Sequence, residues 1–213
     1  MKRIFCSLFI FCLSCHLLIM AQTAFPLDSI RRGDLLFVEN RQGNAITDVT
    51  QGFNGKKIDH VGIVVSTDSI ICILEACHRG VVYSPLCRFL SDATQNNRSA
   101  TVWIGRITCK CNIDKSIKNA TKYLGRPYDY YFMPDDKEIY CSELVQKSFI
   151  NDAGKLIFHP IPMSFHDSKG HITHYWQRYY MKRHLKVPEG APGSNPGELS
   201  GNKLIRIMGY YNK

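Results

Sequence analysis

Two runs of β-branched and aliphatic residues constrain the fold of this chain most. They occupy residues 61–65 and 70–76 and flank a short polar segment of serine, threonine and aspartate. Such a pattern is typical of an antiparallel β-hairpin. Further short apolar runs, which we expect to extend the hairpin into a larger antiparallel sheet, occupy residues 33–40, 81–83, 102–107 and 204–210.

Three segments have the apolar spacing of helices instead. Residues 141–149 place their apolar side chains on one face, and Tyr140 precedes the run. Asp114 is the predicted N-cap of an earlier helix that carries Leu124 near its end. Residues 45–53 predict a third, short helix.

The composition fits one globular domain. The chain has 213 residues, of which 45% are hydrophobic and 21% are charged, values that exclude a wholly disordered protein. A mean hydropathy of −0.17 argues against several membrane spans. The net charge of +9 can attract nucleic acid, anionic lipid or an acidic polymer, and does not choose among them. Together with the element pattern, this predicts an α+β fold in which an antiparallel sheet packs against helices.

The N-terminus is typical of a secretory signal peptide. A short basic start leads into an almost uninterrupted apolar run over residues 4–20. That run is shorter than the roughly 20 residues that a spanning helix needs. We therefore expect residues 1–21 to be cleaved and residues 22–213 to be exported to the periplasm or the cell exterior. The alternatives are an uncleaved anchor and a lipoprotein modified at Cys15.

The cysteines allow disulfides or a metal site. Three of the nine lie in the signal peptide, and an exported compartment permits disulfides among the rest. Their spacing lacks the paired C-x2-C pattern of structural zinc sites, and the histidines near the C-terminus lack an H-E-x-x-H motif. We expect no metal and no cofactor, and the disulfide pairing stays open. The cysteines after the signal peptide are Cys72, Cys77, Cys87, Cys109, Cys111 and Cys141.

Cys141 and His60 are the candidates for nucleophilic chemistry. Cys141 falls in the first turn of its predicted helix, where unpaired N–H groups and the positive end of the dipole favour a thiolate and can hold an oxyanion. His60 opens one strand of the predicted hairpin. The alternatives are a buried structural cysteine and a strand histidine without a chemical role.

Glu75 is the candidate third residue. A hairpin loop of two or four residues would place His60 directly opposite Glu75, whereas an odd loop would break that pairing. Glu75 interrupts the apolar run 70–76, which is costly unless its carboxylate is paired. A carboxylate there can orient the imidazole and hold its charged form. The alternative is an edge position that faces water.

Four motifs in one order carry a resemblance to a known family. They are DHVGIVV with His60, ILEA with Glu75, the turn-rich LGRPYDYYF, and YCSELV with Cys141. Together they resemble the YiiX/YebB-like branch of the NlpC/P60 superfamily, whose members are circularly permuted, papain-like cysteine hydrolases. The resemblance covers residues 31–149 well and the C-terminal third weakly.

The resemblance implies a role for each site residue. Cys141 would be the nucleophile, His60 the general base and then acid, and Glu75 the orienting residue. Ser142 and Glu143 are expected to be helix-surface or capping groups. The candidates for the oxyanion site and the substrate cleft, each with a purely structural alternative, are Tyr140, Tyr128 and Asp129.

The expected activity is hydrolysis of an amide bond in cell-wall peptide, a peptidoglycan fragment or a peptide-like small molecule. One alternative is a hydrolase or acyltransferase that acts on acyl lipids or esters. Another is a binding module that retains the fold with an unreactive Cys141, and a third is a disulfide-rich structural protein. Nucleic acid is not an expected partner, and the sequence leaves the oligomeric state open.

Three further segments complete the expectations. Residues 171–186 are basic and aromatic and can face a wall polymer or lipid headgroups, or form a solvated helix face. Residues 188–201 are rich in glycine and proline and predict a loop, which would cover the cleft or leave it open. Residues 91–99 predict a polar loop.

Overall fold

The computed structural model describes residues 25–94, 100–135 and 137–212. The expected signal peptide, residues 1–21, lies outside the described residues. In the described ranges, no helix is long and apolar enough to cross a membrane.

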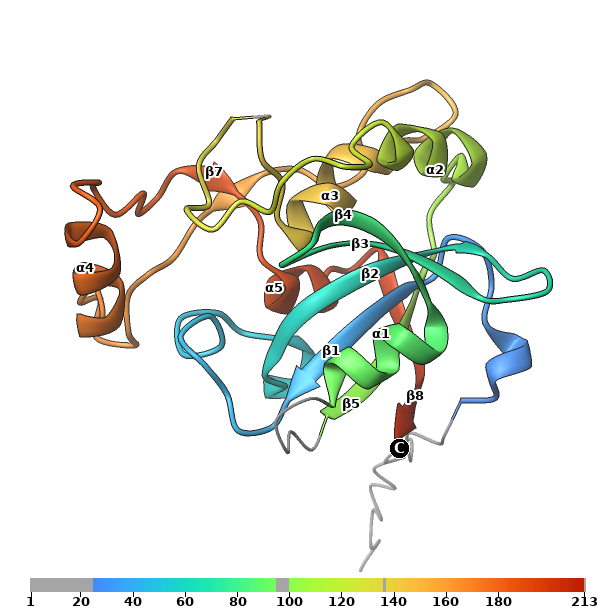
Figure 1. Ribbon diagram of the computed structural model, residues 1–213, viewed down its shortest axis with the longest axis horizontal. Coiled ribbons are helices and arrows are strands. Elements are labelled where there is room, and N and C mark those ends of the chain that lie inside the picture. Colours follow the sequence, from blue (N-terminus) through green and yellow to red (C-terminus); the bar gives the residue numbers. More distant parts are fainter. Residues whose placement is uncertain (1–24, 95–99, 136, 213) are drawn as a thin grey trace, which may run out of the picture.

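One antiparallel sheet of six strands forms the centre of the molecule (Figure 1). Its spatial order is β4-β3-β2-β1-β5-β8. The predicted hairpin of β2 and β3 therefore lies between β4 and β1. Each run that predicted a strand does form one. The strands are β1 (Leu35–Asn40), β2 (Ile58–Ser66), β3 (Cys72–Cys77), β4 (Gly80–Pro85), β5 (Ala100–Ile107) and β8 (Ile205–Asn212).

Helices cover both faces of this sheet. The helices are α1 (Leu86–Ala93), α2 (Ile113–Thr121), α3 (Cys141–Ser148), α4 (His174–Met181) and α5 (Pro196–Ser200). Side chains of α1 pack with Leu36, Val64 and Ile73 on one face. Side chains of α2, α3 and α5 pack with Leu35, Ile63 and the other inward residues of the opposite face. This alternation along each strand follows from the two-residue period of a pleated sheet, and the α+β fold class is confirmed.

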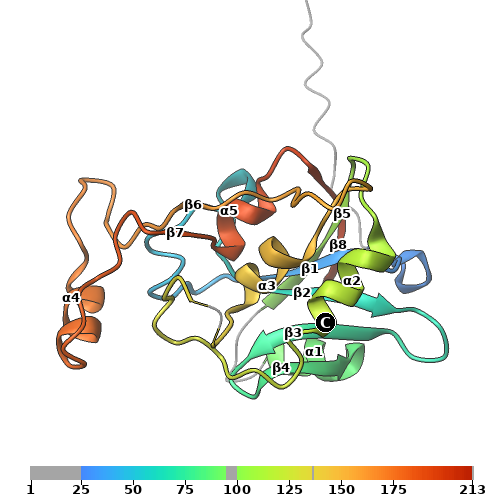
Figure 2. The same ribbon diagram turned by 90° about the horizontal axis from the view of Figure 1, so that it is seen from above.

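The fourth helix stands beside the sheet rather than on it (Figure 2). The two-residue strands β6 (Ile161–Pro162) and β7 (Pro192–Gly193) pair with each other. They stand at the start and the end of the segment that contains α4. The α4 region has its own core of Met163, Phe165, Trp176 and Tyr180. We call the segment from β6 to β7 the α4 lobe.

Three predictions of secondary structure are wrong. Residues 45–53 form successive turns and only a short 3-10 helix, η2 (Phe53–Gly55). Asn44 caps a first turn, but the N–H of Val49 and the hydroxyl of Thr50 both bond to the carbonyl of Ile46, so the turn does not continue as a helix. The predicted polar loop 91–99 begins inside α1, and its residues 95–99 lie outside the described ranges. The 188–201 loop contains β7 and α5.

The N-cap of α2 also differs from the expectation. Asn112, not Asp114, accepts the capping hydrogen bond, from the N–H of Lys115 at 3.1 Å. The helix ends at Thr121, so Leu124 lies beyond it and is 45% exposed. The apolar face therefore extends only as far as Ala120.

Candidate active site

Cys141 is the first residue of α3 and is 3% exposed. The helix begins there because Tyr140 is held extended as the N-cap, while Leu144 and Val145 anchor the helix in the core below β2 and β3. The first N–H groups of a helix have no intrahelical partner, and the positive end of the dipole lies with them. This position favours an anionic sulfur and, later, an oxyanion.

His60 connects the thiol to a carboxylate. Its Nε2 lies 2.7 Å from Oε2 of Glu75, and the thiol of Cys141 is close enough to raise the pKa of the ring. The ring stacks on Phe89 of α1, with 5.7 Å between the ring centroids. Burial lowers the pKa of His60, but the bonds to Cys141 and Glu75 outweigh it and hold that pKa well above its usual value. The ring is thereby kept as a proton donor.

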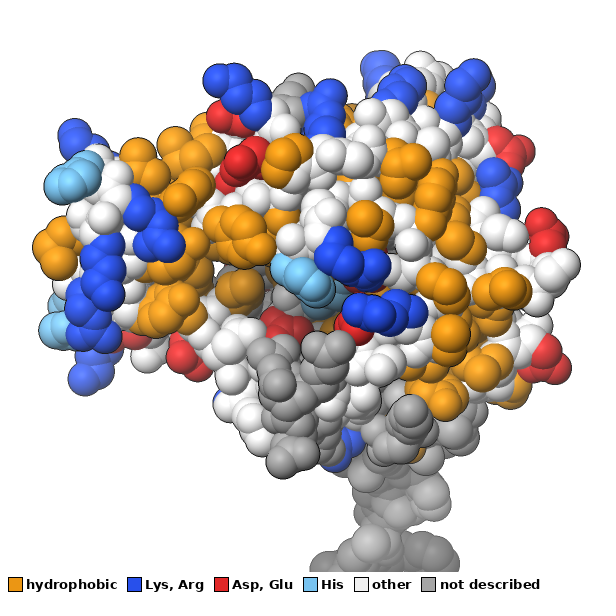
Figure 3. Space-filling view, viewed as in Figure 1, with side chains coloured by type: hydrophobic (Ala, Val, Ile, Leu, Met, Phe, Trp, Pro, Cys, Tyr) orange, Lys and Arg blue, Asp and Glu red, His pale blue; other side chains and the backbone are white. Residues whose placement is uncertain are grey.

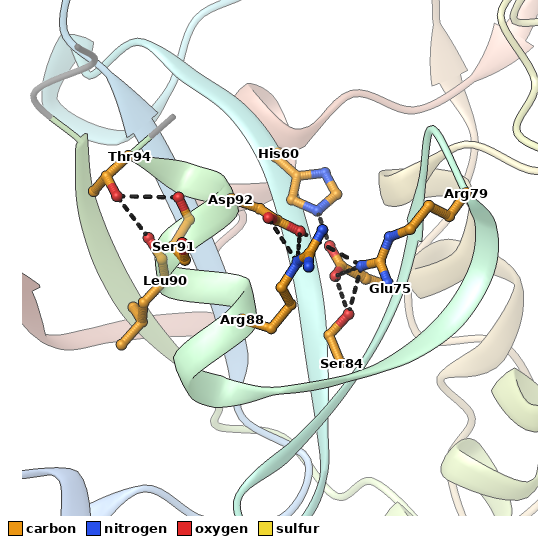
Figure 4. Close-up of polar contacts among 9 residues, drawn as sticks. All are labelled: His60, Glu75, Arg79, Ser84, Arg88, Leu90, Ser91, Asp92 and Thr94. Atoms are coloured by element: carbon orange, nitrogen blue, oxygen red, sulfur yellow. Dashed lines mark hydrogen bonds and ion pairs between the residues drawn. The ribbon is translucent and has the colours of Figure 1, made fainter. Parts of the chain in front are cut away.

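Glu75 is enclosed by polar partners, as Figure 4 shows. Its Oε1 accepts a 2.5 Å hydrogen bond from the hydroxyl of Ser84 and lies 3.5 Å from Nη2 of Arg79. The residue is 3% exposed. Burial raises the pKa of Glu75, yet the hydrogen bond and charge of His60 prevail and lower it. The carboxylate therefore stays ionised beside the imidazole.

The predicted register of His60 and Glu75 is wrong in detail. Ile63 pairs with Leu74 and Val64 with Ile73, so continuing this register puts Glu75 opposite Gly62, one pleat away from His60. The observed register differs from the predicted one by two residues. Because side chains alternate with a period of two, both residues still share a face, and the contact is diagonal rather than direct.

A β-bulge beside His60 places a residue that sequence reasoning missed. Val38 pairs with His60 but Glu39 pairs with Ile58, so Asp59 is the extra residue of β2. Its Oδ2 accepts hydrogen bonds from the side-chain amides of Asn40 at 2.9 Å and Asn44 at 2.8 Å. Asp59 lines the cleft on both sides of the thiol. No single-residue signal predicts a bulge, and only its position before His60 could have drawn attention to it.

Tyr140 links the start of α3 to the 188–201 segment. Its hydroxyl accepts a 3.0 Å hydrogen bond from the N–H of Ser194, and burial raises the pKa of Tyr140 to about 12. The hydroxyls of Ser142 and Ser194 are 3.1 Å apart. Gln146 donates to the carbonyl of Gly193 at 3.2 Å. The 188–201 segment thus forms a wall of the cleft, with Ser194, Asn195 and Pro196 lining it.

Tyr128 and Asp129 have different surroundings: one lines the cleft and the other bonds to a loop. Tyr128 lines the cleft beside Cys141, and burial, followed by the nearby thiol, raises the pKa of its phenol well above the usual value. Asp129 instead organises the loop before α3: its two carboxylate oxygens accept the N–H groups of Tyr131 and Met133, both at 2.7 Å. That position supports the turn role for Asp129 rather than contact with a substrate.

Glu143 caps α3 from within the protein. Its carboxylate accepts a 3.5 Å bond from the N–H of Tyr140 and lies 2.6 Å from Nζ of Lys147. Burial raises the pKa of Glu143 to about 7, which the bond and charge of Lys147 only partly oppose. Glu143 is therefore a capping group, as expected, although it is buried rather than on the helix surface.

Two neighbouring hollows lie at the site. The first has a volume of about 30 Å³, includes Cys141 and is mainly apolar. The second has a volume of about 220 Å³ and includes His60, Glu75, His78 and Asp92. Asp59 and Tyr128 line both. The six cysteines of the described residues carry free thiols, and within the same residues no group of three or more His, Cys, Asp or Glu could hold a metal ion.

Comparisons with known proteins identify a family and a similar fold. A family model described as permuted papain-like amidase enzyme, YaeF/YiiX, C92 family, matches residues 29–187. An uncharacterised YiiX protein of Escherichia coli K12 is 29% identical over 124 residues, 57% of this chain and 58% of its own length. The crystal structure of YiiX from Escherichia coli O157:H7, titled a metalloprotein, has a TM-score of 0.67 at 21% identity and covers 86% of this chain and 98% of its own.

Proposed function

Because the chain belongs to the permuted papain-like amidase family, we propose that it is a cysteine amidase whose catalytic residues are Cys141, His60 and Glu75. The family membership confirms the expected resemblance and supports a thiol hydrolase at a coarse level. One observation carries the finer assignment: the imidazole of His60 lies 2.7 Å from the carboxylate of Glu75 and is close enough to Cys141 for the thiol to raise its pKa. That is the arrangement of nucleophile, base and orienting group.

The reaction follows from these positions. The sulfur of Cys141 attacks the carbonyl carbon, and the C–S bond forms as the carbonyl π electrons move to oxygen. His60 then donates its proton to the amide nitrogen, the C–N bond breaks and the amine leaves. Water attacks the resulting thioester while His60 takes one of its protons. The C–S bond breaks, the carboxylic acid departs and the thiolate–imidazolium pair is restored.

The N-terminus of α3 supplies the oxyanion site in this scheme. The N–H of Cys141 and the dipole of its helix lie where negative charge develops on the carbonyl oxygen. Tyr140 fixes the start of the helix through Ser194. Its hydroxyl is therefore a positioning group.

We place this amidase outside the cytoplasm, where a signal peptide over residues 1–21 would deliver it to wall peptides or peptide-like molecules. The basic segment 171–186 includes α4, and Figure 3 shows Lys and Arg side chains gathered on that lobe. Met181 is 66% exposed among them. A combination of cations and exposed apolar side chains suits an anionic surface, so contact with wall or membrane stays a prediction.

The pH dependence of alkylation at Cys141 tests the proposed function. We expect iodoacetamide to modify Cys141 rapidly well below the pKa of a free thiol, about 8.5, and His60→Ala to abolish this low-pH reactivity. Peptide mass spectrometry separates Cys141 from the other thiols, and the exposed Cys87 serves as an internal control. Reactivity of Cys141 that follows Cys87 at every pH would support the binding module instead.

A further inference from the structure

Three arginines surround an open hollow at the edge of the sheet. The hollow lies beside β8, which is the last strand in the order of the sheet (Figure 1), and it has a volume of about 410 Å³. No aspartate or glutamate of the described residues lines it. Its lining consists of Arg31, Arg106, Ile107, Thr108, Arg206 and Met208.

This hollow and the active site lie on opposite faces of the sheet. Arg106 follows Ile104 by two residues, so both side chains lie on one face, which is the face that α1 covers. Met208 packs against the same cluster of apolar residues. Cys141 belongs to the cluster on the other face. A ligand in the hollow would therefore not be the substrate of the thiol.

The register of the sheet places like charges opposite each other. Arg106 of β5 pairs directly with Arg206 of β8, and like charges at directly opposite positions of two strands are destabilising. Arg31 brings a third positive charge to the same hollow. An anion between the three side chains would relieve this repulsion.

Asp34 neutralises one of these charges and fixes its position. Asp34 is 2% exposed, and its carboxylate accepts hydrogen bonds from Nε and Nη2 of Arg106 at 2.8 and 2.7 Å. The carbonyl of Ser29 accepts another from the same Nη2 at 2.9 Å. These bonds hold the guanidinium in one orientation and do not use its Nη1. Within the described parts of the chain, the exposed Arg31 and Arg206 have no acidic partner.

The remaining charge matches a phosphate group. Three arginines and the one aspartate that neutralises Arg106 leave a net charge of +2 at the hollow. A phosphate monoester carries about −1.5 to −2 at pH 7, whereas a carboxylate carries a single negative charge. The planar guanidinium also presents pairs of N–H donors that fit two oxygens of a phosphate group.

We propose that this hollow is a binding site for a phosphate monoester group, which Arg31, Arg106 and Arg206 hold together. The site is independent of the amidase chemistry, because it lies on the other face of the sheet. The phosphate group belongs either to a soluble ester or to the headgroup of a lipid such as phosphatidic acid, and the experiments below distinguish these sources.

Isothermal titration calorimetry with inorganic phosphate, at constant ionic strength in sodium chloride, tests the site. Arg206→Gln should weaken phosphate binding about tenfold, because it removes charge-assisted hydrogen bonds. Arg106 is left unchanged, since its loss would leave the buried Asp34 without a cation. Absence of phosphate binding to the wild type would overturn the proposal and leave the arginines as charges that protect an edge strand from pairing. Chloride that competes as strongly as phosphate would overturn it too.

Arg178 provides the matched control. It is an exposed arginine of α4, so Arg178→Gln makes the same change in net charge at another place. This variant should bind inorganic phosphate as the wild type does. Equal weakening in Arg178→Gln and Arg206→Gln would show a response to net charge alone and would contradict a site at the edge of the sheet.

Vesicles of phosphatidylcholine and phosphatidic acid distinguish the two sources of the phosphate group. Loss of sedimentation with these vesicles in Arg206→Gln, but not in Arg178→Gln, would assign the site to a lipid headgroup. Sedimentation that Arg206→Gln leaves unchanged, or that is absent in the wild type, would assign the site to a soluble ester if the same variant weakens the binding of inorganic phosphate.

Discussion

The carboxylate of Glu75 is removed from water and nevertheless held ionised. Three groups face it: the ring of His60, the hydroxyl of Ser84 and the guanidinium of Arg79. An isolated buried carboxylate would be protonated instead. The enclosure therefore maintains a negative charge beside the imidazole of His60, whose pKa it raises.

Replacing Glu75 tests this role. In Glu75→Gln the charge is lost and the shape is kept, so the pKa of His60 should fall, and kcat/KM for an N-acyl amide should fall about a hundredfold. The measurements are an NMR titration of the His60 ring and steady-state kinetics. Ser84→Ala removes one hydrogen bond and keeps the carboxylate, so its effect should be much smaller. Equal losses in the two variants would assign Glu75 a structural role.

Glu143 predicts a pH dependence of stability. Its pKa is about 7 in the folded protein and about 4.3 in an unfolded chain, so the folded state binds the proton more tightly. The free energy of unfolding should then decrease as the pH rises from about 4 to 7. The decrease attributable to this group is on the order of 3 kcal/mol.

Urea unfolding of the wild type and Glu143→Gln across this range measures the effect. The variant lacks the titrating group, so its free energy of unfolding should decline less between pH 4 and 7. Parallel curves for the two proteins would show that Glu143 does not carry the dependence.

The chemistry of single residues identified most of the catalytic candidates but not their surroundings. Cys141 and His60 were recognisable because their residue types fit the expected chemistry in the expected order, and Glu75 because it interrupts an apolar run. Asp59 and Ser84 were not. The position of Asp59 depends on a bulge, and Ser84 reaches Glu75 across neighbouring strands. Neither arrangement leaves a pattern in the sequence.

Elements differ in how directly the sequence specifies them. The strands were predicted because β-branched runs between turn residues have few alternatives. Residues 45–53 have helical spacing, yet the hydroxyl of Thr50 and the N–H of Val49 bond to the carbonyl of Ile46, which a continued helix would bond to the N–H of Thr50. No element was predicted for residues 84–90, because helix α1 has only eight residues and its few apolar positions are too short a pattern to indicate a helix.

The sequence did not predict the contact between α3 and the 188–201 segment. In Tyr140→Phe the N–H of Ser194 loses its acceptor, and the free energy of unfolding should fall by about 1–3 kcal/mol. Because Ser194 lines the hollow that includes Cys141, KM should rise while kcat changes little. Denaturant titration and steady-state kinetics measure the two effects.

Tyr180→Phe is the matched control for this junction. Tyr180 is also buried, and its hydroxyl donates to the carbonyl of Tyr131 at 2.9 Å, away from α3. This variant should lose comparable stability without the rise in KM. A similar KM in both variants would show that the Tyr140 hydroxyl supports the fold and not the wall of the cleft.

At the scale of the whole molecule, the cleft lies between two bodies with separate cores. The sheet and its helices carry Cys141, His60 and Glu75, and the α4 lobe supplies Met163, Phe165 and Trp176 of the apolar lining. The lobe is tied to the body at defined points, such as the bond from the indole N–H of Trp176 to the carbonyl of Ala45 at 3.1 Å. The proposed catalytic residues and much of the apolar lining therefore belong to different cores.

The diagonal contact of His60 and Glu75 also has a consequence for the order of assembly. The two residues are 15 positions apart and lie on adjacent strands of one hairpin, so their pairing closes a short loop and can form early. Cys141 reaches them only when α3 packs against β2 and β3. The chain can therefore hold the pair of His60 and Glu75 before the thiol joins it. The last walls of the cleft, from residues 194–196, follow Cys141 in the chain.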